Sequence, residues 1–441
     1  MIMMLLNSPD DKALLFVETA GSKSLINRYL ILNSIHRQNL SLYPGSECAD
    51  VMEMLTCLEK LGLHYRLETC SDIPVISCQY QNLKNVSKEI LIDIHEAGTV
   101  FRFLITRLAL EDGYTFRMRV GESLMKRPFL PLVEALQKLG ADISVRQNEL
   151  LIKGKTLEGG KVLLPSDISS QFVSSLLLSA SLFKSDLEIS FYQSKVQSSL
   201  LYSESYIRMT IQMLKQLGIK CEMGTDRIYC ENRKSAFTDN EIAVESDYST
   251  APSFWVLSLI TGRKIAVAVS EKVGLQGDLQ FITLLKQLGF RKVIYEKSGK
   301  QYLAFEGEFS DGIDVSMKDM PDQVMNLAIL ALFCNTPTVI RDIEILRFKE
   351  SDRIENLKTG LKHLNVCVQY ENEQLLIEPG ICIDKPVELC SCNDHRLAMI
   401  WMILKQKYPL IKIDNTDCIK KSAPEFLTFL IRLDTDNLRH G

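Results

Sequence analysis

The stretch Leu136-Gln137-Lys138-Leu139-Gly140 occurs, with small changes, at five places in the chain. The copies end at positions 62, 140, 218, 289 and 365, which gives intervals of 78, 78, 71 and 76 residues. Four copies end in Gly and the fifth in Asn365, and both residue types tolerate the left-handed backbone that follows many helices. Each copy is therefore predicted to end an amphipathic helix, and the regular spacing indicates an internal repeat.

The residues around each copy predict one order of elements. In the unit that contains Gly140, strands are expected at 89–94 and 114–120, with a helix at 98–110 between them. The Leu-rich helix follows, and a hairpin with strands at 141–145 and 149–153 ends the unit. Six such β-α-β-α-β-β units of about 74 residues would fill the 441 residues.

The two ends of the chain suggest that the repeat closes on itself. The last expected helix, 424–433, is followed by no hairpin, whereas the chain begins with a hairpin pattern at 1–6 and 12–18. We infer that these N-terminal strands complete the last unit. The predicted fold is α/β, with one three-unit domain at 20–238 and a second formed by 1–19 plus 239–441. Because the chain would cross twice between the domains, we expect a hinge and a cleft there.

Composition excludes several classes of protein. The chain is 46% hydrophobic and 24% charged, with a formal net charge of −4, so a chain-wide basic field for nucleic acid is absent. Its apolar stretches are far shorter than a membrane span. Twelve Cys occur without a Cys-x-x-Cys pair. We therefore expect a cytoplasmic protein with reduced thiols that binds neither nucleic acid nor membranes.

Cationic residues gather where a predicted strand ends and a helix begins. Free backbone N–H groups and the helix dipole make such junctions attractive to anions, and Arg adds a bidentate fork. If both halves of the chain face one cleft, that cleft would hold small, highly anionic ligands. The cations at these junctions are Lys23, Arg28, Arg102, Arg127, Lys349, Arg353, Arg396 and Lys421.

The junction motifs together resemble the 5-enolpyruvylshikimate-3-phosphate synthase family. They occur in the family's order between residues 21 and 424, so the resemblance covers nearly the whole chain. It implies two inverse α/β domains, each of three βαβαββ units, with a cleft between them. The motifs are Gly21-Ser-Lys-Ser24 with Arg28, Ala97-Gly-Thr-x-x-Arg102, Lys126-Arg-Pro128, Ser169-Ser-Gln171, Pro321-Asp322, Lys349-Glu-Ser-Asp-Arg353, Asn393-Asp-His-Arg396 and Lys421-Ser-x-Pro424.

The resemblance implies a reaction and its participants. The enolpyruvyl group of phosphoenolpyruvate would pass to the 5-hydroxyl of shikimate 3-phosphate with release of phosphate, a step of chorismate and aromatic amino acid biosynthesis. In the family this is an addition–elimination that uses no metal or organic cofactor, and the enzyme is a monomer. The partners implied are thus two small molecules, and the herbicide glyphosate is implied as an inhibitor that packs against Gly98.

Site residues follow from the matched motifs. Asp322 would accept the proton of the 5-hydroxyl, Glu350 with Lys349 or Lys23 would protonate the phosphoenolpyruvate methylene, and His395 would lie beside them. The residues implied for shikimate 3-phosphate are Lys23, Ser24, Arg28, Ser169, Ser170, Gln171, Ser203, Tyr206, Asp322 and Lys349. Those implied for phosphoenolpyruvate are Lys23, Gly98, Arg102, Arg127, Gln171, Arg353, Arg396 and Lys421.

One departure from the family pattern concerns the phosphate region. Glu96 stands where the family commonly has Asn before Ala-Gly-Thr. A carboxylate there would repel a phosphate unless a Lys or Arg pairs with it. We therefore expect glyphosate to compete with phosphoenolpyruvate, with a sensitivity that depends on Glu96.

Three alternatives remain open from the residues. A sister enolpyruvyl transferase acts on UDP-N-acetylglucosamine, but the first motif of that family has a Lys-Asn pair where this chain has Lys23-Ser24. A non-catalytic anion-binding homologue would have no need for Asp322 and Glu350 in the same cleft. A metal site at Cys390-x-Cys392-x-x-His395 lacks an obvious fourth ligand, so no metal is expected.

Overall fold

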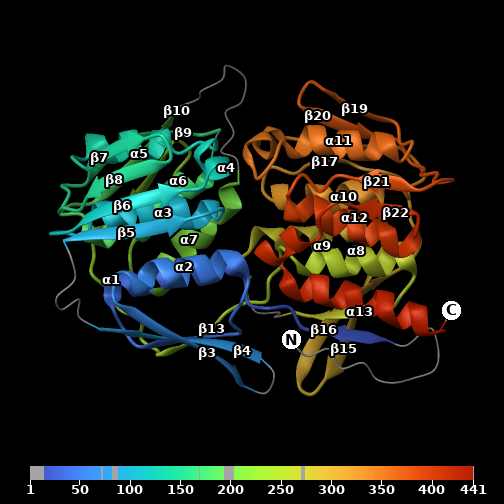
Figure 1. Ribbon diagram of the computed structural model, residues 1–441, viewed down its shortest axis with the longest axis horizontal. Coiled ribbons are helices and arrows are strands. Elements are labelled where there is room, and N and C mark those ends of the chain that lie inside the picture. The colour runs from blue at the N-terminus through green and yellow to red at the C-terminus, as the bar shows by residue number, and fades with distance from the viewer. Residues whose placement is uncertain are drawn as a thin grey trace. The chain divides into compact units, whose positions relative to one another are not determined.

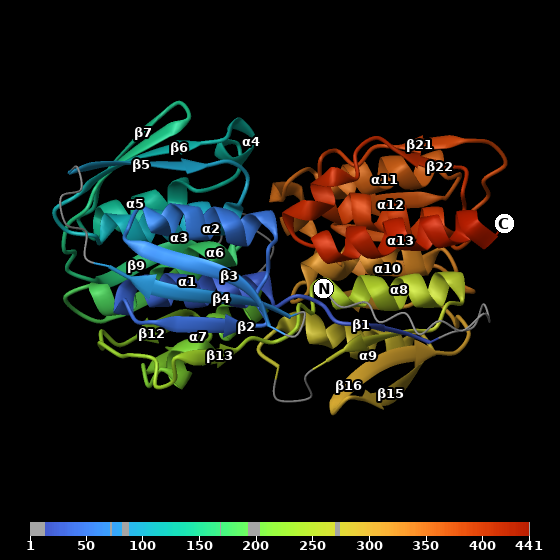
Figure 2. The same ribbon diagram turned by 60° about the horizontal axis from the view of Figure 1, so that its bottom comes forward.

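The chain forms two compact units. A computed structural model describes residues 14–70, 73–81, 88–167, 169–192, 203–269 and 274–440. The N-unit comprises the described parts of 23–70 and 74–244, and the C-unit those of 1–22, 71–73 and 245–441. Figures 1 and 2 show that helices fill the inside of each unit and that the sheets lie around them. Among the described helices, none is long and apolar enough to cross a membrane.

The unit predicted around Gly140 is present. Strand β5 (Glu89–Ile94) runs parallel to β6 (Thr115–Val120), β6 is antiparallel to β8 (Glu149–Lys153), and β8 is antiparallel to β7 (Asp142–Arg146). The helices of this unit are α3 (Gly98–Ala109), the short α4 (Glu122–Met125) and α5 (Leu130–Lys138). Alternation of buried and exposed residues along β5 shows why this segment is a strand with one face on the core.

Two further sheets complete the N-unit. One has the order β11-β12-β10-β9, and the other has the order β13-β2-β4-β3. The elements of the first are β9 (Gly160–Pro165), α6 (Ser170–Leu178), β10 (Leu187–Tyr192), α7 (Glu204–Gln216), β11 (Cys221–Met223) and β12 (Arg227–Cys230). Those of the second are α1 (Lys23–His36), β2 (Leu40–Tyr43), α2 (Ala49–Glu59), β3 (Leu63–Cys70), β4 (Ile73–Tyr80) and β13 (Glu241–Ala243).

The C-unit repeats the same plan. Its four-stranded sheets have the orders β1-β14-β16-β15 and β17-β18-β20-β19, and β21 pairs with β22. The strands are β1 (Leu15–Val17), β14 (Ile265–Ala268), β15 (Arg291–Lys297), β16 (Lys300–Glu306), β17 (Asp314–Ser316), β18 (Thr338–Arg341), β19 (Val368–Glu371), β20 (Gln374–Ile377), β21 (Val387–Leu389) and β22 (Ile411–Ile413). The helices are α8 (Ala251–Thr261), α9 (Gln280–Gln287), α10 (Val324–Ala331), α11 (Arg353–His363), α12 (His395–Lys407) and α13 (Pro424–His440), with short 3-10 turns at Gly277–Leu279, Pro321–Gln323, Glu344–Phe348 and Asp417–Lys421.

The N-terminal strand joins a different sheet from the one predicted. Strand β1 pairs in parallel with β14, not with β21 or β22, so the prediction that it completes the last unit is wrong for this strand. Side-chain contacts explain the choice, because Phe16 meets Tyr302 edge to face and Glu18 binds Lys300 at 2.7 Å. The other predicted strand, 1–6, lies outside the described residues.

The repeated Leu-x-x-Leu-Gly segment ends its helices as predicted. Gly62, Gly140, Gly218 and Gly289 have φ between 75° and 97°, and the fifth copy ends at Asn365 with φ of 59°. A residue with a Cβ is strained at such angles, except that Asn tolerates them better than most. The sequence repeat is therefore a repeat of helix ends, and each one turns the chain into the hairpin that follows.

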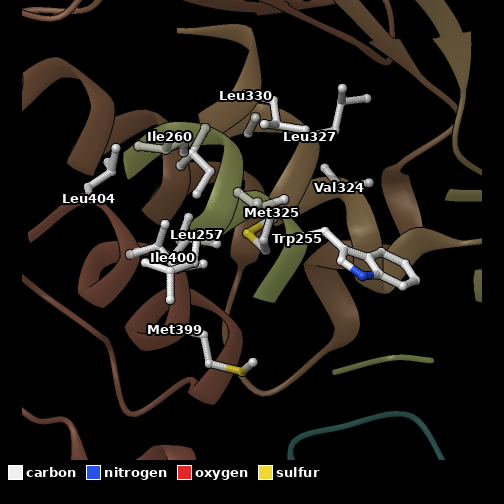
Figure 3. Packing of buried hydrophobic residues seen from close by; sticks show 14 of the residues in the cluster. Trp255, Leu257, Ile260, Val324, Met325, Leu327, Leu330, Met399, Ile400 and Leu404 are labelled. Atoms are coloured by element: carbon white, nitrogen blue, oxygen red, sulfur yellow. The ribbon is translucent and has the colours of Figure 1, made fainter. Parts of the chain in front are cut away.

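Three helices form the centre of the C-unit core. Helices α8, α10 and α12 are buried along nearly their whole length, and Figure 3 shows their apolar side chains packed together, among them Leu257, Met325 and Ile400. Both tryptophans of the chain, Trp255 and Trp401, belong to this core and are almost fully buried. Tryptophan fluorescence therefore reports on the C-unit alone.

Gly360 tests how closely this core is packed. A Cβ on Gly360 of α11 would lie 2.4 Å from Cζ2 of Trp401, a rigid ring that cannot move aside cheaply. We expect Gly360→Ala to lower the free energy of unfolding by about 1 kcal/mol, since overpacking costs about 1–3 kcal/mol while the gain in helix propensity is only about 1 kcal/mol. Urea unfolding followed by tryptophan fluorescence measures the change. The control is Thr359→Ala, because Thr359 is the exposed neighbour on the same helix; equal stability of the two variants would contradict the prediction.

Candidate functional site

In the N-unit, Lys23 and Arg28 lie in the first turns of α1. The Lys23 Nζ is 2.8 Å from Oδ2 of Asp50, near the start of α2. Arg28 is almost fully buried and donates hydrogen bonds to uncharged acceptors, which are the hydroxyls of Thr210 and Ser174 and the carbonyls of Ser24 and Tyr206. Burial lowers the pKa of Arg28 to about 10, so the guanidinium still carries its charge at neutral pH.

A second group surrounds the N-terminus of α3. The buried Arg102 donates to Oε1 of Gln171 at 2.7 Å and to the carbonyl of Pro128 at 2.6 Å. A Cβ on Gly98 would lie 2.8 Å from Nη1 of Arg102 and 3.0 Å from both Nη atoms of Arg127. A Cβ there would therefore make these guanidinium groups, which converge on the start of the helix, shift. Such a cluster is suited to binding a phosphate or a carboxylate.

The remaining predicted N-unit residues lie at helix starts beside these groups. Ser169 caps α6 by accepting a hydrogen bond from the backbone N–H of Gln171 at 3.3 Å, and Ser170 is the first residue of that helix. Ser203 precedes α7 with φ of 58°, and its carbonyl accepts from the N–H of Tyr206. Helix α6 connects the two groups, because Gln171 contacts Arg102 and Ser174 contacts Arg28.

Glu96 is exposed in the loop before α3. A different acid, Glu53 of α2, holds this loop by accepting from the backbone N–H of His95 at 2.6 Å and that of Ala97 at 3.0 Å. Burial raises the pKa of Glu53, while these two hydrogen bonds oppose the shift. Glu53 was not predicted as part of the site, yet it shapes the segment in which Glu96 and Gly98 lie.

In the C-unit, Arg353 is the centre of a network of charges. Its guanidinium is 2% exposed and binds three carboxylates, with Asp322 at 3.0 Å, Glu350 at 2.9 Å and Asp394 at 2.8 Å. Burial opposes the charge of this group, but the three carboxylates raise the pKa of Arg353. The network thus joins the 3-10 turn before α10, the loop before α11 and the N-terminus of α12.

Asp322 is the carboxylate that most cations approach. Its Oδ1 lies 3.3 Å from Nζ of Lys349, and its Oδ2 lies 3.8 Å from Nη2 of Arg396. Burial by itself would raise the pKa of Asp322, but Lys349, Arg396 and Arg353 outweigh it and hold that pKa well below its usual range. Asp322 is therefore ionised at neutral pH and can accept a proton.

Glu350 and His395 complete the cluster. Lys421 Nζ is 3.3 Å from Oε1 of Glu350, while Arg353 binds the other oxygen. Ligand atoms of Glu350, Asp394 and His395 lie within 4.8 Å of one another, a spacing that could hold a metal ion. The two carboxylates already bind Arg353, and Asp394 also caps α12 through the N–H of Arg396 at 2.9 Å, so this donor set is better suited to fixing the guanidinium than to binding a cation.

Comparisons with known proteins identify the family of this chain. The sequence model of a family described as EPSP synthase (3-phosphoshikimate 1-carboxyvinyltransferase) matches residues 16–430. The chain belongs to the EPSP synthase family. A 3-phosphoshikimate 1-carboxyvinyltransferase of Marinomonas sp. (strain MWYL1) is 33% identical over 417 residues, which cover 93% of this chain and 94% of that one. One of Haemophilus influenzae (strain Rd) is 32% identical over 421 residues, with the same two shares of the chains covered.

Solved structures of EPSP synthase share the fold. A structure of EPSP synthase from Acinetobacter baumannii superposes with a TM-score of 0.70 and covers 96% of each chain at 23% identity. A second structure of EPSP synthase from that organism also gives 0.70, at 20% identity. The chain therefore has the two-domain enolpyruvyl transferase fold, which is the fold class that the resemblance to the family implied.

Asp278 is a site residue that the sequence analysis of this EPSP synthase family member missed. It lies in the turn before α9, is 3% exposed, and accepts from the Ser249 hydroxyl at 3.0 Å and from Nε2 of Gln323 at 3.1 Å. The Ser249 carbonyl in turn accepts from Nη1 of Arg396. Asp278 is placed at a helix start like the predicted residues, but the sequence pattern that predicts the site is mainly one of cations at such junctions. Asp394 lies within a predicted motif, where the sequence predicts no role for it.

The buried position of Asp278 predicts a pH dependence of stability. Burial, foremost, and the charge of Asp322 raise the pKa of Asp278 from its ordinary value of 3.8 to about 6. A carboxyl group with a raised folded-state pKa binds a proton on folding between these values, so its stabilising contribution is lost as pH rises through about 6. Asp278→Asn should remove this dependence. We expect its deficit in unfolding free energy relative to wild type to shrink by about 1 kcal/mol between pH 5 and pH 7.

Urea unfolding at both pH values, followed by tryptophan fluorescence, measures this difference. Asp384→Asn is the control for the loss of one negative charge, since Asp384 is exposed in the same unit. A deficit for Asp278→Asn that is the same at pH 5 and pH 7 would show that the carboxyl group titrates at the same pH in the folded and the unfolded chain.

Proposed function

We propose that this chain transfers the enolpyruvyl group of phosphoenolpyruvate to the 5-hydroxyl of shikimate 3-phosphate and releases phosphate. Family membership supports the reaction, and the observation that carries the residue assignment is the Asp322 carboxylate among three cations. We further propose that the two units are the two domains of the enzyme, that residues of both act on one pair of substrates, and that the enzyme is a cytoplasmic monomer without a metal or organic cofactor.

The N-unit residues are proposed to bind the anionic groups of the substrates. Arg28 is held by uncharged hydroxyl and carbonyl groups, so its positive charge remains available to a phosphate. Arg102 and Arg127 converge at Gly98. A molecule with a phosphate and a carboxylate, such as phosphoenolpyruvate, could bind there to two guanidinium groups, and glycine has no Cβ to obstruct it. Lys23, Ser24, Ser169, Ser170, Gln171, Ser203 and Tyr206 are proposed to contact the substrates from the neighbouring helix starts.

The C-unit residues are proposed to move the protons. In the free protein three cations make Asp322 a weak base. Anionic substrates that bind Lys349, Arg353 and Arg396 would offset those charges, so the basicity of Asp322 would rise when a substrate is present. Asp322 can then accept the proton of the 5-hydroxyl as the new bond forms.

The proton for the methylene carbon is proposed to come from the opposite side of the cluster. Glu350 is paired there with Lys421, and His395 lies beside it. Lys349 or Lys23 would assist, because an ammonium group can stabilise the charge that develops on the phosphate that leaves.

Phosphate release with different acceptors tests the function. Shikimate 3-phosphate with phosphoenolpyruvate should support turnover, whereas UDP-N-acetylglucosamine, the acceptor of the sister enzyme, should not. We expect Asp322→Asn to lower kcat by about 10²–10⁴-fold, the range for loss of a positioned general base. Lys23→Met should lower kcat/KM, and the matched control is Lys138→Met, because Lys138 is exposed on α5 of the same unit. Full turnover by Asp322→Asn would refute its assignment as the base, and turnover only with the UDP-sugar would refute the proposed acceptor.

Glyphosate should compete with phosphoenolpyruvate for the site around Gly98. We expect the apparent inhibition constant to rise in proportion to the phosphoenolpyruvate concentration, as measured by initial rates at several fixed glyphosate concentrations. Gly98→Ala should weaken binding of both molecules, since its Cβ would displace the Arg102 and Arg127 guanidinium groups. Inhibition that does not change with phosphoenolpyruvate would contradict the prediction.

A further inference from the structure

Two cysteines stand directly before the Asn393-Asp394-His395-Arg396 motif, and no step of the proposed reaction uses them. The Sγ atoms of Cys390 and Cys392 are 3.4 Å apart. Cys390 is exposed and Cys392 is partly exposed, so both thiols can meet small molecules from solvent. Both belong to the C-unit, between the end of β21 and the start of α12.

The backbone turn brings these two side chains together. Residues i and i+2 of an extended strand share a face but stand about 7 Å apart. Here Cys392 and Asn393 have φ of 51° and 54°, so the chain turns and the two sulfurs come closer. The N–H of Cys392 donates to Sγ of Cys390 at 3.2 Å, and the N–H of Ser391 donates to Oδ1 of Asp414 at 2.7 Å. Cys390 also donates its thiol proton to Oδ2 of Asp414, at 3.1 Å. The turn thus holds the thiols in place without a covalent bond.

The same turn positions charged residues of the site. Its next residue, Asp394, caps α12 and binds Nε of Arg353 at 2.8 Å. The Nε1 of Trp401, about two helical turns further along α12, donates to the carbonyl of Cys390 at 3.2 Å. A structural change at Cys390 or Cys392 would therefore affect Asp394, and through Asp394 it would affect Arg353. It would also affect the N-terminal turn of α12, which contains His395 and Arg396.

We propose that Cys390 and Cys392 are a reversible thiol–disulfide pair that regulates this site. A low-molecular-weight disulfide supplies the oxidant. The thiolate of Cys390 attacks one sulfur of that disulfide, which forms a mixed disulfide and releases the first small thiol. The sulfur of Cys392 then attacks Sγ of Cys390, loses its proton to water, and releases the second small thiol. Two protein thiols are oxidised to one disulfide, and one small disulfide is reduced to two thiols.

The order of these steps follows from the surroundings of each sulfur. Burial, foremost, and the hydrogen bond with Cys390 raise the pKa of Cys392 to about 12, and Asp414 and Asp394 add to the shift. Cys392 is therefore a poor first nucleophile, while Cys390 is the exposed member of the pair. Once Cys390 carries the mixed disulfide, the short distance between the sulfurs favours the second attack over release of the adduct.

Oxidation should weaken the binding of phosphoenolpyruvate, a consequence that rests on the proposed function. The Sγ–Sγ distance must fall from 3.4 Å to about 2.05 Å, and the thiol proton that Asp414 accepts is lost. The turn has to rearrange, and with it the cap of α12 that aligns Arg353 and Arg396. A disulfide across a single intervening residue is strained, so it should be easily reduced, as regulatory disulfides are.

The full chain, equilibrated with mixtures of reduced and oxidised glutathione, provides the test. Cleavage after Glu388 and Arg396 yields the fragment 389–396, which contains Cys390 and Cys392 and no other cysteine. We expect this fragment to lose the mass of two hydrogen atoms as the oxidised fraction rises. The KM for phosphoenolpyruvate should rise at least threefold over the same range, and dithiothreitol should restore both.

Variants separate this pair from the other cysteines. Cys392→Ser should leave Cys390 with a glutathione adduct, form no internal disulfide and lose the response of the KM. Cys367→Ser and Cys382→Ser are the controls, because these cysteines are also exposed in the C-unit, and both variants should respond like wild type. Two separate adducts on the fragment, a link from Cys390 to Cys418, or an oxidised fragment with an unchanged KM would each overturn the proposal.

A readout that does not need turnover separates this proposal from the proposed function. Hydrogen exchange at the first amides of α12, including Arg396, should speed up on oxidation and slow again on reduction, whichever substrate the enzyme uses. If exchange responds in wild type and not in Cys392→Ser while shikimate 3-phosphate supports no turnover, the proposed function fails and the thiol pair stands. If turnover is present and exchange does not respond, the thiol pair fails alone.

Discussion

The buried guanidinium of Arg353 is the interaction on which the C-unit site depends. It binds carboxylates from three separate segments, the 3-10 turn at Asp322, the loop at Glu350 and the helix cap at Asp394. Removing one member of a buried charge network costs about 3–5 kcal/mol, because it leaves its partners uncompensated. Removal of Arg353 would leave three carboxylates without this cation. The side chain that we assign to substrate binding is thus also the one that holds the catalytic segments in place.

Two buried guanidinium groups, Arg28 in the N-unit and Arg353 in the C-unit, have different kinds of partner. In the C-unit, Lys349, Arg353 and Lys421 each face a carboxylate, so the charges there are nearly balanced. In the N-unit, Lys23 likewise binds Asp50 and the buried Arg107 binds Glu111, whereas Arg28 is surrounded by hydroxyl and carbonyl groups. Balanced charges favour groups that exchange protons, whereas cations held by uncharged groups retain attraction for anions.

Much of the fold could be predicted because each repeat contains sequence patterns that determine local structure. The helix ends at Gly140 and Gly289 need a left-handed residue, and a single sequence shows that directly. The pairing of β1 with β14 could not be predicted, because β-strand pairing depends on contacts such as Phe16 with Tyr302, which lie 286 residues apart in the sequence. Periodicity within a strand says which face is buried but not which neighbour it will have.

The candidate site was predictable to the extent that its residues are cations at helix starts. Arg102 and Arg353 follow that rule. Glu53 and Asp278 do not, since each acts on the site through a backbone N–H or a hydroxyl group rather than by facing a ligand. Their roles depend on which helix packs beside which loop, and that information exists only in three dimensions.

The chain passes between the two units twice, and residues predicted for the site or in contact with them follow each crossing. Strand β1 of the C-unit leads directly into α1 of the N-unit, and β13 of the N-unit leads into α8 of the C-unit. The two crossing segments pair with each other, as the N–H of Ser22 donates to the carbonyl of Glu245 at 2.9 Å and that of Asp247 to the carbonyl of Ala20 at 3.0 Å. Lys23 follows one crossing at once, and Ser249, which holds Arg396, follows the other by a few residues. The pairing therefore fixes the C-unit backbone directly before Lys23 and shortly before Ser249.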